Sequence, residues 1–484
     1  MTFPTVHDID DDGAAETLIW YGDGRVVALE YVGDDDAVAP NSLGVWFGSR
    51  INQGIRAIIQ VRLKTQSGMR HRTVVAIAIL VFVLVSLIAG RMQIGGFGGR
   101  SSVLWVSDTA REVSGNHHAP AVGRIEDRGV VYAPISGRAD TENCELAALN
   151  GANGHSKWQY QIPAPDCTIH AVADPTVADY DADGIDEVLA ATTENKLIAY
   201  DPLTGDAEFE HELTSYGYTK PIVADVVGDG DPEIVVIDVQ GTVFVIRSDG
   251  TTVWTRQLGS YTWGQSAVDD FDSDGEPEIA VGAGGSGQLY LFEHDGRSAW
   301  ETPVSFESSI TWMATGQADG DSAAEIVVAT ARGGLVAMVD GDANTVWERG
   351  LGSFAAVNTV VDGDGDGSSE VYAVAKDGIL YSLAAGDGTT EWTTTLTTAD
   401  VQMMPPPSVG DVDGDGTIEL VAPTNDGIVS VVDPRSGEIV WTYEREDAIY
   451  THPTLADIDG DGDGDVKAFV MYGRGRVVAF DFGR

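Results

Sequence analysis

Short apolar stretches separated by polar segments rich in Asp and Gly recur along the chain between Asp179 and Asp465. In the unit that begins at Pro221, the apolar stretches lie at 221–225, 234–239, 242–246 and 252–256. Each has the length of a strand. The Asp249-Gly250 pair before the last stretch is typical of a tight hairpin turn, because both central residues must accept a positive φ. The pattern therefore predicts four short antiparallel strands in each unit.

The unit repeats with a regular period. The sixth position of its acidic loop advances in steps of 46, 45, 47, 45, 49 and 46 residues through Gly184, Gly230, Gly275, Ser322, Gly367, Gly416 and Gly462. A unit of this size cannot bury its own apolar face, so the units must stack on one another. Four strands in a repeat of this length is the blade pattern of a β-propeller.

The number of blades follows from the two ends of the repeat array. An earlier unit, from about Ala119 to Ile162, has the strands but carries 124–129 in place of the acidic loop. The last unit ends at 481–484, where its fourth strand should begin, and Ser101–Ser107 has the pattern of that missing strand. We therefore expect an all-β fold, an eight-bladed β-propeller over residues 101–484 that is closed by an N-terminal strand. Such closure would remove an exposed sheet edge.

An aromatic residue occupies the same place in the outermost strand of nearly every unit. The set is Trp158, Phe209, Trp254, Trp300, Trp347, Trp392 and Trp441. A stacking platform for a cofactor or sugar is one interpretation of this set. The regular placement on the outer strand favours the other, in which each ring packs between neighbouring blades.

The N-terminal part differs in character from the repeats. Residues 37–72 are basic, and no Asp or Glu occurs from Ala37 to Ser107. Residues 73–90 are eighteen residues without a charge, which is near the lower limit for a membrane-spanning helix. A cleavable signal peptide is the alternative, but 87–90 make a poor cleavage site. We expect an uncleaved transmembrane helix, followed by a Gly-rich linker at 91–100.

The flanking charges predict an orientation for this helix. Six basic residues lie between Arg50 and Arg72, whereas only Arg91 and Arg100 follow closely. The positive-inside tendency then places the N-terminus in the cytoplasm and the propeller outside the cell, on a single-pass protein of the cell membrane.

Residues 1–36 look like the end of a second propeller. Pro4–Gly13 and Tyr21–Ala28 nearly copy Pro453–Gly462 and Tyr472–Ala479. One blade cannot bury its faces alone. Two origins for residues 1–68 stay open: a wrongly assigned start or fusion with a tandem copy, and a genuine cytoplasmic tail.

Composition adds a constraint on partners. The chain has 76 acidic residues against 28 Lys and Arg, which gives a net charge of −48. Such a surface repels phosphate backbones, so we expect no nucleic-acid partner. Because the acids are spread over every repeat, the composition favours the solubility pattern of halophilic proteins over a surface that excludes acidic substrates.

The loop consensus Asp-x-Asp-x-Asp-Gly-x-x-Glu indicates cation sites. Carboxylates at alternate positions of a tight loop converge on one point, the Gly permits the turn, and many hard oxygen ligands suit Ca²⁺ better than Mg²⁺ or Zn²⁺. The complete sets are Asp179, Asp181, Asp183 and Glu187; Asp270, Asp272, Asp274 and Glu278; Asp362, Asp364, Asp366 and Glu370; Asp411, Asp413, Asp415 and Glu419; and Asp457, Asp459, Asp461 and Asp465.

Two further loops depart from the consensus. The set Asp225, Asp229 and Glu233 has Val227 at its third position and should bind a cation more weakly. The loop with Gln317, Asp319, Asp321, Ser322 and Glu325 is degraded, and an empty loop is one outcome for it. An abundance of Asp without any ion is the alternative for the whole set, but five complete loops at one place in the blade favour metal sites.

These motifs resemble known families. The Asp-x-Asp-x-Asp-Gly loops between the first two strands resemble the FG-GAP/VCBS repeats of integrin α-subunit-like propellers, over about residues 101–484. The third and fourth strands, as in 197–205 and 431–441, are similar to the repeats of PQQ-type quinoproteins. The resemblance implies a propeller fold that serves adhesion, scaffolding and several enzymes. The adjacent Cys-Cys pair of quinoprotein alcohol dehydrogenases is missing, so we do not expect PQQ as a cofactor.

No catalytic motif occurs in the sequence, and the histidines are interpreted as loop or surface residues. Cys144 and Cys167 lie on the side predicted to be extracellular, where a disulfide could persist; two free buried cysteines are the alternative. We expect a Ca²⁺-binding module of the cell surface that binds a protein or polysaccharide ligand. The alternative is a quinoprotein-like or carbohydrate-active enzyme with its site in the central funnel.

Overall fold

A computed structural model describes residues 102–483 except 112–114, 126–127, 265 and 459–465, together with five short strands between residues 5 and 60. The chain divides into two compact units, Met1–Gln93 and Ile94–Arg484. In the first unit, β1 (Thr5–His7), β2 (Glu16–Trp20) and β3 (Val26–Leu29) form one antiparallel sheet, and β4 (Gly44–Phe47) pairs with β5 (Ala57–Gln60). The origin predicted for residues 1–68 stays a prediction.

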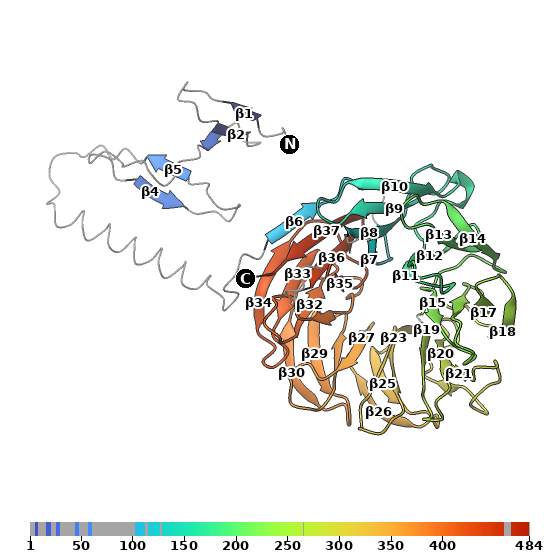
Figure 1. Ribbon diagram of the computed structural model, residues 1–484. Helices are drawn as coiled ribbons and strands as arrows, with labels where there is room; N and C mark the ends of the chain where they lie inside the picture. The colour runs from blue at the N-terminus through green and yellow to red at the C-terminus, as the bar shows by residue number, and fades with distance from the viewer. Residues whose placement is uncertain are drawn as a thin grey trace, which may run out of the picture. The chain divides into compact units, whose positions relative to one another are not determined.

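The second unit is the expected propeller. Eight four-stranded antiparallel sheets form its blades (Figure 1). Each innermost strand contacts the innermost strands of both neighbouring blades, and β35 contacts β7, so the ring is closed. The all-β, eight-bladed prediction is therefore confirmed.

The blades follow one another along the chain, and within each blade the order runs from the innermost strand outward. The first four blades are β7 (Ala121–Ile125), β8 (Arg128–Ile135), β9 (Glu145–Asn150) and β10 (Ser156–Gln161); β11 (Thr176–Ala178), β12 (Glu187–Thr192), β13 (Lys196–Tyr200) and β14 (Ala207–Glu212); β15 (Ile222–Ala224), β16 (Glu233–Ile237), β17 (Thr242–Arg247) and β18 (Thr252–Gln257); and β19 (Ser266–Asp269), β20 (Glu278–Gly282), β21 (Gln288–Phe292) and β22 (Val304–Ser305).

The remaining four blades repeat this order. They are β23 (Ile310–Gly316), β24 (Glu325–Thr330), β25 (Leu335–Val339) and β26 (Thr345–Gly350); β27 (Ala356–Val361), β28 (Glu370–Val374), β29 (Ile379–Ala384) and β30 (Thr390–Thr395); β31 (Ser408–Gly410), β32 (Glu419–Pro423), β33 (Ile428–Val432) and β34 (Ile439–Glu444); and β35 (Thr454–Ala456), β36 (Lys467–Tyr472), β37 (Arg476–Asp481) and β6 (Ser102–Val106).

Burial explains why the strands differ in composition. The second strand of each blade is covered on both faces by neighbouring blades, so strands such as β12 and β16 are buried at every position. The outermost strands face solvent on one side and alternate, as in β10. The apolar side chains therefore form the core between blades rather than at the centre of the ring.

The N-terminal strand β6 closes the last blade as expected. It pairs antiparallel with β37, with Trp105 opposite Ala479 and Val106 opposite Val478. Beyond the strand, the backbone N–H of Ser107 donates to the carbonyl of Val477 at 2.9 Å. The two ends of the propeller thus share one sheet, visible in Figure 1 where the cyan β6 lies beside the red β37.

The outer-strand tryptophans pack between blades rather than forming a platform. Trp105, Trp158, Trp254, Trp300 and Trp347 are each less than one-tenth exposed. Their indole N–H groups, and that of Trp392, donate over 2.6 to 3.0 Å to a carbonyl of the next blade, in the order Gly151, Pro202, His294, Gly341, Ala385 and Pro434. Trp300 departs from the expected placement, because it precedes the two-residue strand β22 instead of lying within it.

A glycine in the next blade makes room for each of several indoles, and this gives a sharp test. A Cβ on Gly388 would lie 2.5 Å from Trp347, whereas one on Gly259 would meet nothing within 4 Å, although both residues have φ of +66°. Replacement by Ala costs both sites the same backbone strain, but only Gly388→Ala overpacks the interface. We expect Gly388→Ala to lower the free energy of unfolding by about 1–3 kcal/mol more than Gly259→Ala. Equal urea midpoints for the two variants would contradict interblade packing.

The membrane helix predicted at 73–90 and the linker predicted at 91–100 lie outside the described residues. Among the residues that are described, no helix is long and apolar enough to cross a membrane.

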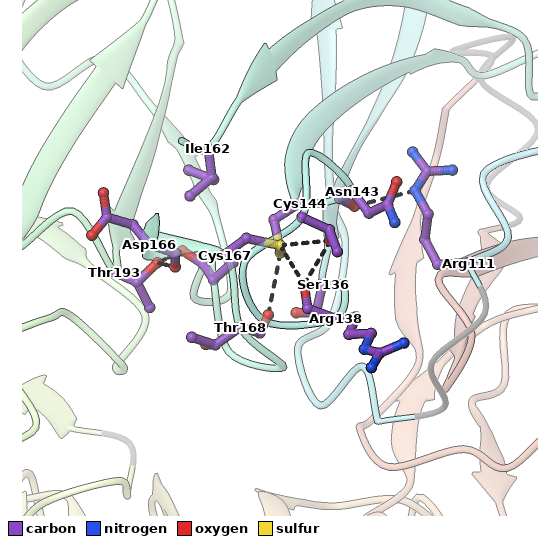
Figure 2. The surroundings of a disulfide bond; sticks show 12 residues. Arg111, Ser136, Arg138, Asn143, Cys144, Ile162, Asp166, Cys167, Thr168 and Thr193 are labelled. Carbon is purple, nitrogen blue, oxygen red and sulfur yellow. Dashed lines mark hydrogen bonds between the residues drawn. A yellow bond between two sulfur atoms is a disulfide. The ribbon is translucent and has the colours of Figure 1, made fainter. Parts of the chain in front are cut away.

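A disulfide joins Cys144 and Cys167, with an S–S distance of 2.05 Å and a Cα–Cα distance of 5.4 Å (Figure 2). Both sulfurs belong to the blade that has no acidic loop. The short 3₁₀ helix η1 (Ala164–Asp166) brings Cys167 back to β9, and the N–H of Ile162 donates to the carbonyl of Cys144 at 2.9 Å. Closing a loop of this length stabilises the fold by about 3 kcal/mol in the chain-entropy model.

Candidate functional site

The acidic loops connect the first two strands of a blade and share one hydrogen-bond pattern. In the loop of the second blade, Asp179 Oδ1 accepts the N–H of Asp183 at 3.0 Å, and its Oδ2 accepts the N–H of Gly184 at 2.9 Å. Gly184 has φ of +91°, which explains why the sixth position is Gly. The first Asp thus fixes the turn, and the equivalent bonds to Gly230, Gly275, Gly367 and Gly416 repeat it.

The closing Glu of each loop is the first residue of the second strand, and the strand register fixes its place. In six blades it pairs with the residue directly before the loop and is buried; these residues are Glu187, Glu233, Glu278, Glu325, Glu370 and Glu419. One carboxylate oxygen accepts the N–H of the second loop position, as from Phe271 to Glu278 Oε2 at 2.8 Å. The other oxygen remains for the interior of the loop.

Within the described residues, carboxylate oxygens converge in five loops. In each, the ligand atoms lie within 4.8 Å of one another, and the groups are Asp179, Asp181 and Glu187; Asp270, Asp272 and Glu278; Asp319, Asp321 and Glu325; Asp362, Asp364, Asp366 and Glu370; and Asp411, Asp413 and Glu419. Of the predicted fifth-position ligands in the first four complete sets, only Asp366 belongs to such a group; Asp183, Asp274 and Asp415 do not. The donor set consists of hard oxygens and therefore fits a cation of the Ca²⁺ type.

The electrostatics of these loops also favour a cation. Burial, followed by the nearby loop aspartates, raises the pKa of Glu187, Glu278 and Glu419 to about 7. In the fourth blade, Glu278 Oε1 and Asp270 Oδ1 are buried without a hydrogen-bond partner. Buried acceptors of this kind are costly unless a cation or a donor satisfies them.

In the loop that departs most from the consensus, the carboxylate oxygens of Asp319, Asp321 and Glu325 also converge. Gln317 takes the place of the first Asp: its Oε1 accepts the N–H of Gly320 at 2.9 Å, and its Nε2 donates to the carbonyls of Asp321 and Ala323 at 2.8 Å. An amide can therefore hold the turn without contributing the carboxylate charge. Comparison with the loop consensus did not reveal this role of Gln317, because the consensus counts only carboxylates as ligands.

In the third blade, an arginine occupies the acidic loop. Arg247 Nη1 lies 2.9 Å from Asp229 Oδ2 and 3.3 Å from Glu233 Oε1. The strand register places Arg247 directly opposite Glu233. The guanidinium supplies a positive charge where an ion would lie. This gives a structural reason for the weaker cation binding that the sequence predicts for Asp225, Asp229 and Glu233.

The ligand set predicted for the last blade stays a prediction, because most of it is not described. Asp459, Asp461 and Asp465 lie outside the described residues. Ala456 pairs with Lys467, eleven residues on, whereas Ala178 pairs with Glu187, nine residues on. The loop is therefore two residues longer, and a buried Lys467, with Nζ 3.6 Å from Asp481 Oδ1, stands in the register of the closing Glu.

The innermost strands surround a central channel with two adjoining cavities that share Asp174 and Lys220. One cavity, of about 410 Å³, lies among the strands and includes His452 and Asn358. The other, of about 320 Å³, lies at a mouth of the channel and is lined mainly by aromatic and histidine side chains: His117, His118, His170, Tyr218, Tyr261, Trp263, Trp312, Phe354 and Tyr450. Within the described part of the chain, no arginine lines either cavity.

The histidines of this cavity lie in loops, as expected from the sequence, but His118 is not at the surface, because it is only 3% exposed. The residues that line this cavity lie close together because they occupy similar places in their blades. His117, Tyr218 and Tyr450 each lie four residues before the innermost strand of their blade. That shared position is the sequence signal that would have revealed the channel lining.

Comparison with known proteins identifies the repeats. A family model described as "Outer membrane protein assembly factor BamB" matches residues 102–272 and 285–484, and an "FG-GAP repeat" model matches 262–292. No curated protein sequence matches the chain.

Among solved structures, the chain is similar in fold to BamB from Moraxella catarrhalis, with a TM-score of 0.53, 16% identity and coverage of 79% of this chain and 98% of that one. It is also similar to the V. cholerae biofilm matrix protein Bap1, with a TM-score of 0.58, 13% identity and coverage of 78% and 90%. The computationally designed Ika8 protein gives a TM-score of 0.54 at 14% identity, with coverage of 78% and 99%.

Proposed function

This chain belongs to the protein family described as "Outer membrane protein assembly factor BamB", and from that premise we propose that it is a Ca²⁺-stabilised binding and scaffolding module rather than an enzyme. The family description names an assembly factor, and such a role requires a surface that binds a partner. We further propose that the segment 73–90 anchors the module in the cell membrane and that the propeller faces outward, which would make a protein or polysaccharide of the cell surface its ligand.

The channel mouth carries this proposal. Tyr261 and Trp263 are 41% and 40% exposed, and their rings pack edge to face with centroids 5.0 Å apart. Half-exposed aromatic rings at the rim of a cavity are the usual anchors of binding sites. The remaining polar lining consists of histidine, tyrosine and threonine side chains, with Lys220 and a paired Asp174, so the mouth lacks the strong negative charge of the rest of the chain.

The cavity lining also weighs against the enzymatic alternative. A quinone or sugar-cleaving site in the funnel should combine arginine, tryptophan and a further free carboxylate. The lining contains Trp263 and Trp312, but its one carboxylate, Asp174, is held by His118, and no arginine is found among the described lining residues. These residues favour ligand binding over catalysis.

The exposed rings give the test. We expect Trp263→Ala and Tyr261→Ala to weaken binding by more than tenfold, because each removes an anchor at the rim. Dextran, alginate and an immobilised library of extended peptides serve as probes in biolayer interferometry. Leu203→Ala is the matched control, because Leu203 is 47% exposed but does not line the cavity. Unchanged melting temperatures would show that the variants are folded.

Two results would contradict the proposal. One is a wild-type chain that binds none of the three probe classes. The other is equal binding by the wild type and by both rim variants, which would move the binding surface away from the channel mouth.

A further inference from the structure

A third cavity, of about 440 Å³, lies between the fourth and fifth blades. Its described lining consists of residues 285–286, 307–309 and 331–332. None of them belongs to a strand: the first and last pairs lie in the turns between the second and third strands of their blades, and residues 307–309 connect β22 to β23. We call this cavity the polar pocket.

The polar pocket opens on the same face of the propeller as the channel mouth. In a blade of four antiparallel strands, the turn after the second strand and the connection to the next blade lie at one end, and the acidic loops lie at the other. Two hydrogen bonds of 2.7 Å join the two cavities: the N–H of Gly285 donates to the carbonyl of Tyr261, and the N–H of Phe354 donates to that of Ala331. Tyr261 and Phe354 line the channel mouth, so the two cavities are neighbours.

One residue of each cavity is held in an unusual backbone conformation. Glu307 of the polar pocket has φ of +55°, and Phe354 of the channel mouth has φ of +46°. Bulky residues rarely adopt this left-handed region. Such strain persists only where the surrounding structure imposes it, and it is common at ligand sites. The two strained residues therefore add weight to a binding surface that includes both cavities.

The lining of the polar pocket indicates the chemistry of its ligand. Apart from Ala331, its described residues carry no apolar side chain. Three serine hydroxyls, the carboxylate of Glu307 and the guanidinium of Arg332 offer both donors and acceptors. Among the described residues, neither charged group has a partner, so both can bind a ligand. A polyol satisfies such a mixed set, because each of its hydroxyl groups can donate and accept.

The charges of the two cavities favour an uncharged ligand. The polar pocket contains one Arg and one Glu, and the channel mouth contains Lys220 and Asp174, so acid and base are balanced in each. The chain as a whole carries a net charge of −48, which repels a polyanion. An uncharged chain of sugars meets neither an unmatched charge in the cavities nor this repulsion.

An extended peptide fits these cavities less well. Such peptides commonly pair with an exposed strand edge, and pockets beside that edge hold their side chains. The described lining of the polar pocket consists of turns and connections, so it offers no strand edge. It also offers no apolar side chain larger than Ala331 to hold an apolar anchor of a peptide.

We propose that the channel mouth and the polar pocket form one binding groove for a chain of uncharged sugars. At the mouth, the exposed rings of Tyr261 and Trp263 pack against the apolar faces of sugar rings. In the polar pocket, Arg332 and Glu307 form hydrogen bonds with the hydroxyl groups of sugars further along the same chain. This inference rests on the proposed ligand binding at the mouth, to which it adds the class of ligand and a second subsite.

The experiment compares ligands of different charge and length on the full chain. The uncharged probes are dextran, mannan and galactan; alginate is the acidic probe, and an extended-peptide library represents proteins. We expect at least one uncharged polysaccharide to bind. In calorimetric titration, oligosaccharides of that polymer should bind about tenfold more tightly than its disaccharide, because only the longer chain reaches both subsites.

Variants assign this gain in affinity to the polar pocket. Arg332→Ala should remove about tenfold of the oligosaccharide affinity and leave the disaccharide affinity unchanged, since a hydrogen bond to a charged group is lost. Trp263→Ala should weaken the binding of both ligands. Arg297→Ala is the matched control, because Arg297 is an exposed arginine of the fourth blade that lines neither cavity, and it should bind as the wild type does.

Glu307→Gly separates binding from folding. Glycine adopts the φ of this position without strain but gives the unfolded chain more freedom, and these two effects on stability oppose each other. We expect a melting temperature close to that of the wild type together with an oligosaccharide affinity lowered by about tenfold. A purely structural role of Glu307 would change the melting temperature and leave the affinity unchanged.

The outcomes distinguish this inference from the proposed function on which it rests. Binding of alginate or peptides, but of no uncharged polysaccharide, would overturn the class of ligand and leave a binding module. Binding of an uncharged polymer that depends on Trp263 but not on Arg332 or Glu307 would overturn the second subsite. A chain that binds none of the probes would overturn the inference and the proposed function together.

Discussion

Deletion of residues 101–107 is expected to abolish the soluble monomer, which is the largest effect that the fold predicts. The deletion exposes β37, whose residues 477–480 are completely buried, as a free strand edge that other chains can pair with. It also removes Trp105, which is 7% exposed and donates to Gly151 of the first blade. Loss of such an indole alone costs about 3–5 kcal/mol, a large share of the roughly 5–15 kcal/mol by which domains are stable.

Size-exclusion chromatography and thermal melting measure this outcome. Trp105→Ala is the milder variant and should lower the melting temperature without opening the sheet. A chain that lacks residues 1–68 is the control, and we expect its propeller to melt as in the full chain. If a chain beginning at Ala110 stayed monomeric with an unchanged melting temperature, closure by β6 would not matter for the fold.

The fold could be predicted because its signals are local and repeated. Asp249-Gly250, a period near 46 residues and one aromatic per unit require no knowledge of distant contacts. The strand pattern at residues 101–107, with Trp105 at the place of the outer-strand aromatic, then identified the strand that completes the last blade. Stacking of identical units turns these local signals into the whole architecture.

The site could be predicted only where it is local as well. Each acidic loop before the last blade lies within nine consecutive residues, so its ligands follow from the sequence. Arg247 enters a loop through strand pairing, and Lys467 reaches the closing position because the last loop is longer. Counting positions along the chain cannot reveal either residue, since the ladder of hydrogen bonds sets the register.

The lining of the channel mouth shows the same limit more strongly. His118 and His170 come from the first two blades, whereas Tyr450, which stacks on His117 with ring centroids 4.4 Å apart, comes from the last. Closure of the ring brings these residues together. Only the geometry of the closed ring, and not the spacing of the histidines, makes them neighbours.

Removal of calcium is expected to destabilise the propeller by an amount that grows with the number of filled loops. At a free Ca²⁺ concentration 100-fold above Kd, one site adds about 2.7 kcal/mol, so five independent loops add on the order of 10 kcal/mol. Chelation should therefore lower the melting temperature, and added Ca²⁺ should restore it. The buffer is kept at constant high salt so that general screening of the acidic surface does not change.

Two variants assign the effect to individual loops. Glu278→Gln preserves the shape of the closing residue but removes its charge, so it should reduce the calcium-dependent rise in melting temperature by the share of one loop. Arg247→Gln removes the guanidinium from the third blade, and we expect that loop to become dependent on Ca²⁺. An unchanged melting curve with and without chelator would end the assignment of the loops as metal sites.

The pH dependence provides an independent check with a definite sign. In the calcium-free protein, burial and neighbouring aspartates raise the pKa of Glu187, Glu278 and Glu419 from 4.5 to about 7. Their contribution to stability is fully present below about pH 4.5 and is lost as the pH rises through 7. His117 and His170, whose pKa is lowered mainly by burial, act in the opposite direction over this range, because their neutral forms are favoured in the fold.

The quantity to compare is therefore the difference in melting temperature between the Ca²⁺-loaded and the chelated protein at each pH, in which the histidine contribution cancels. Protons compete with Ca²⁺ for the closing glutamates at pH 5.5 and no longer do so at pH 8. We expect the difference to increase from pH 5.5 to pH 8, and Ca²⁺ binding near pH 7 to release protons into the buffer. A difference that is equal at both pH values would show that the buried glutamates do not coordinate the ion.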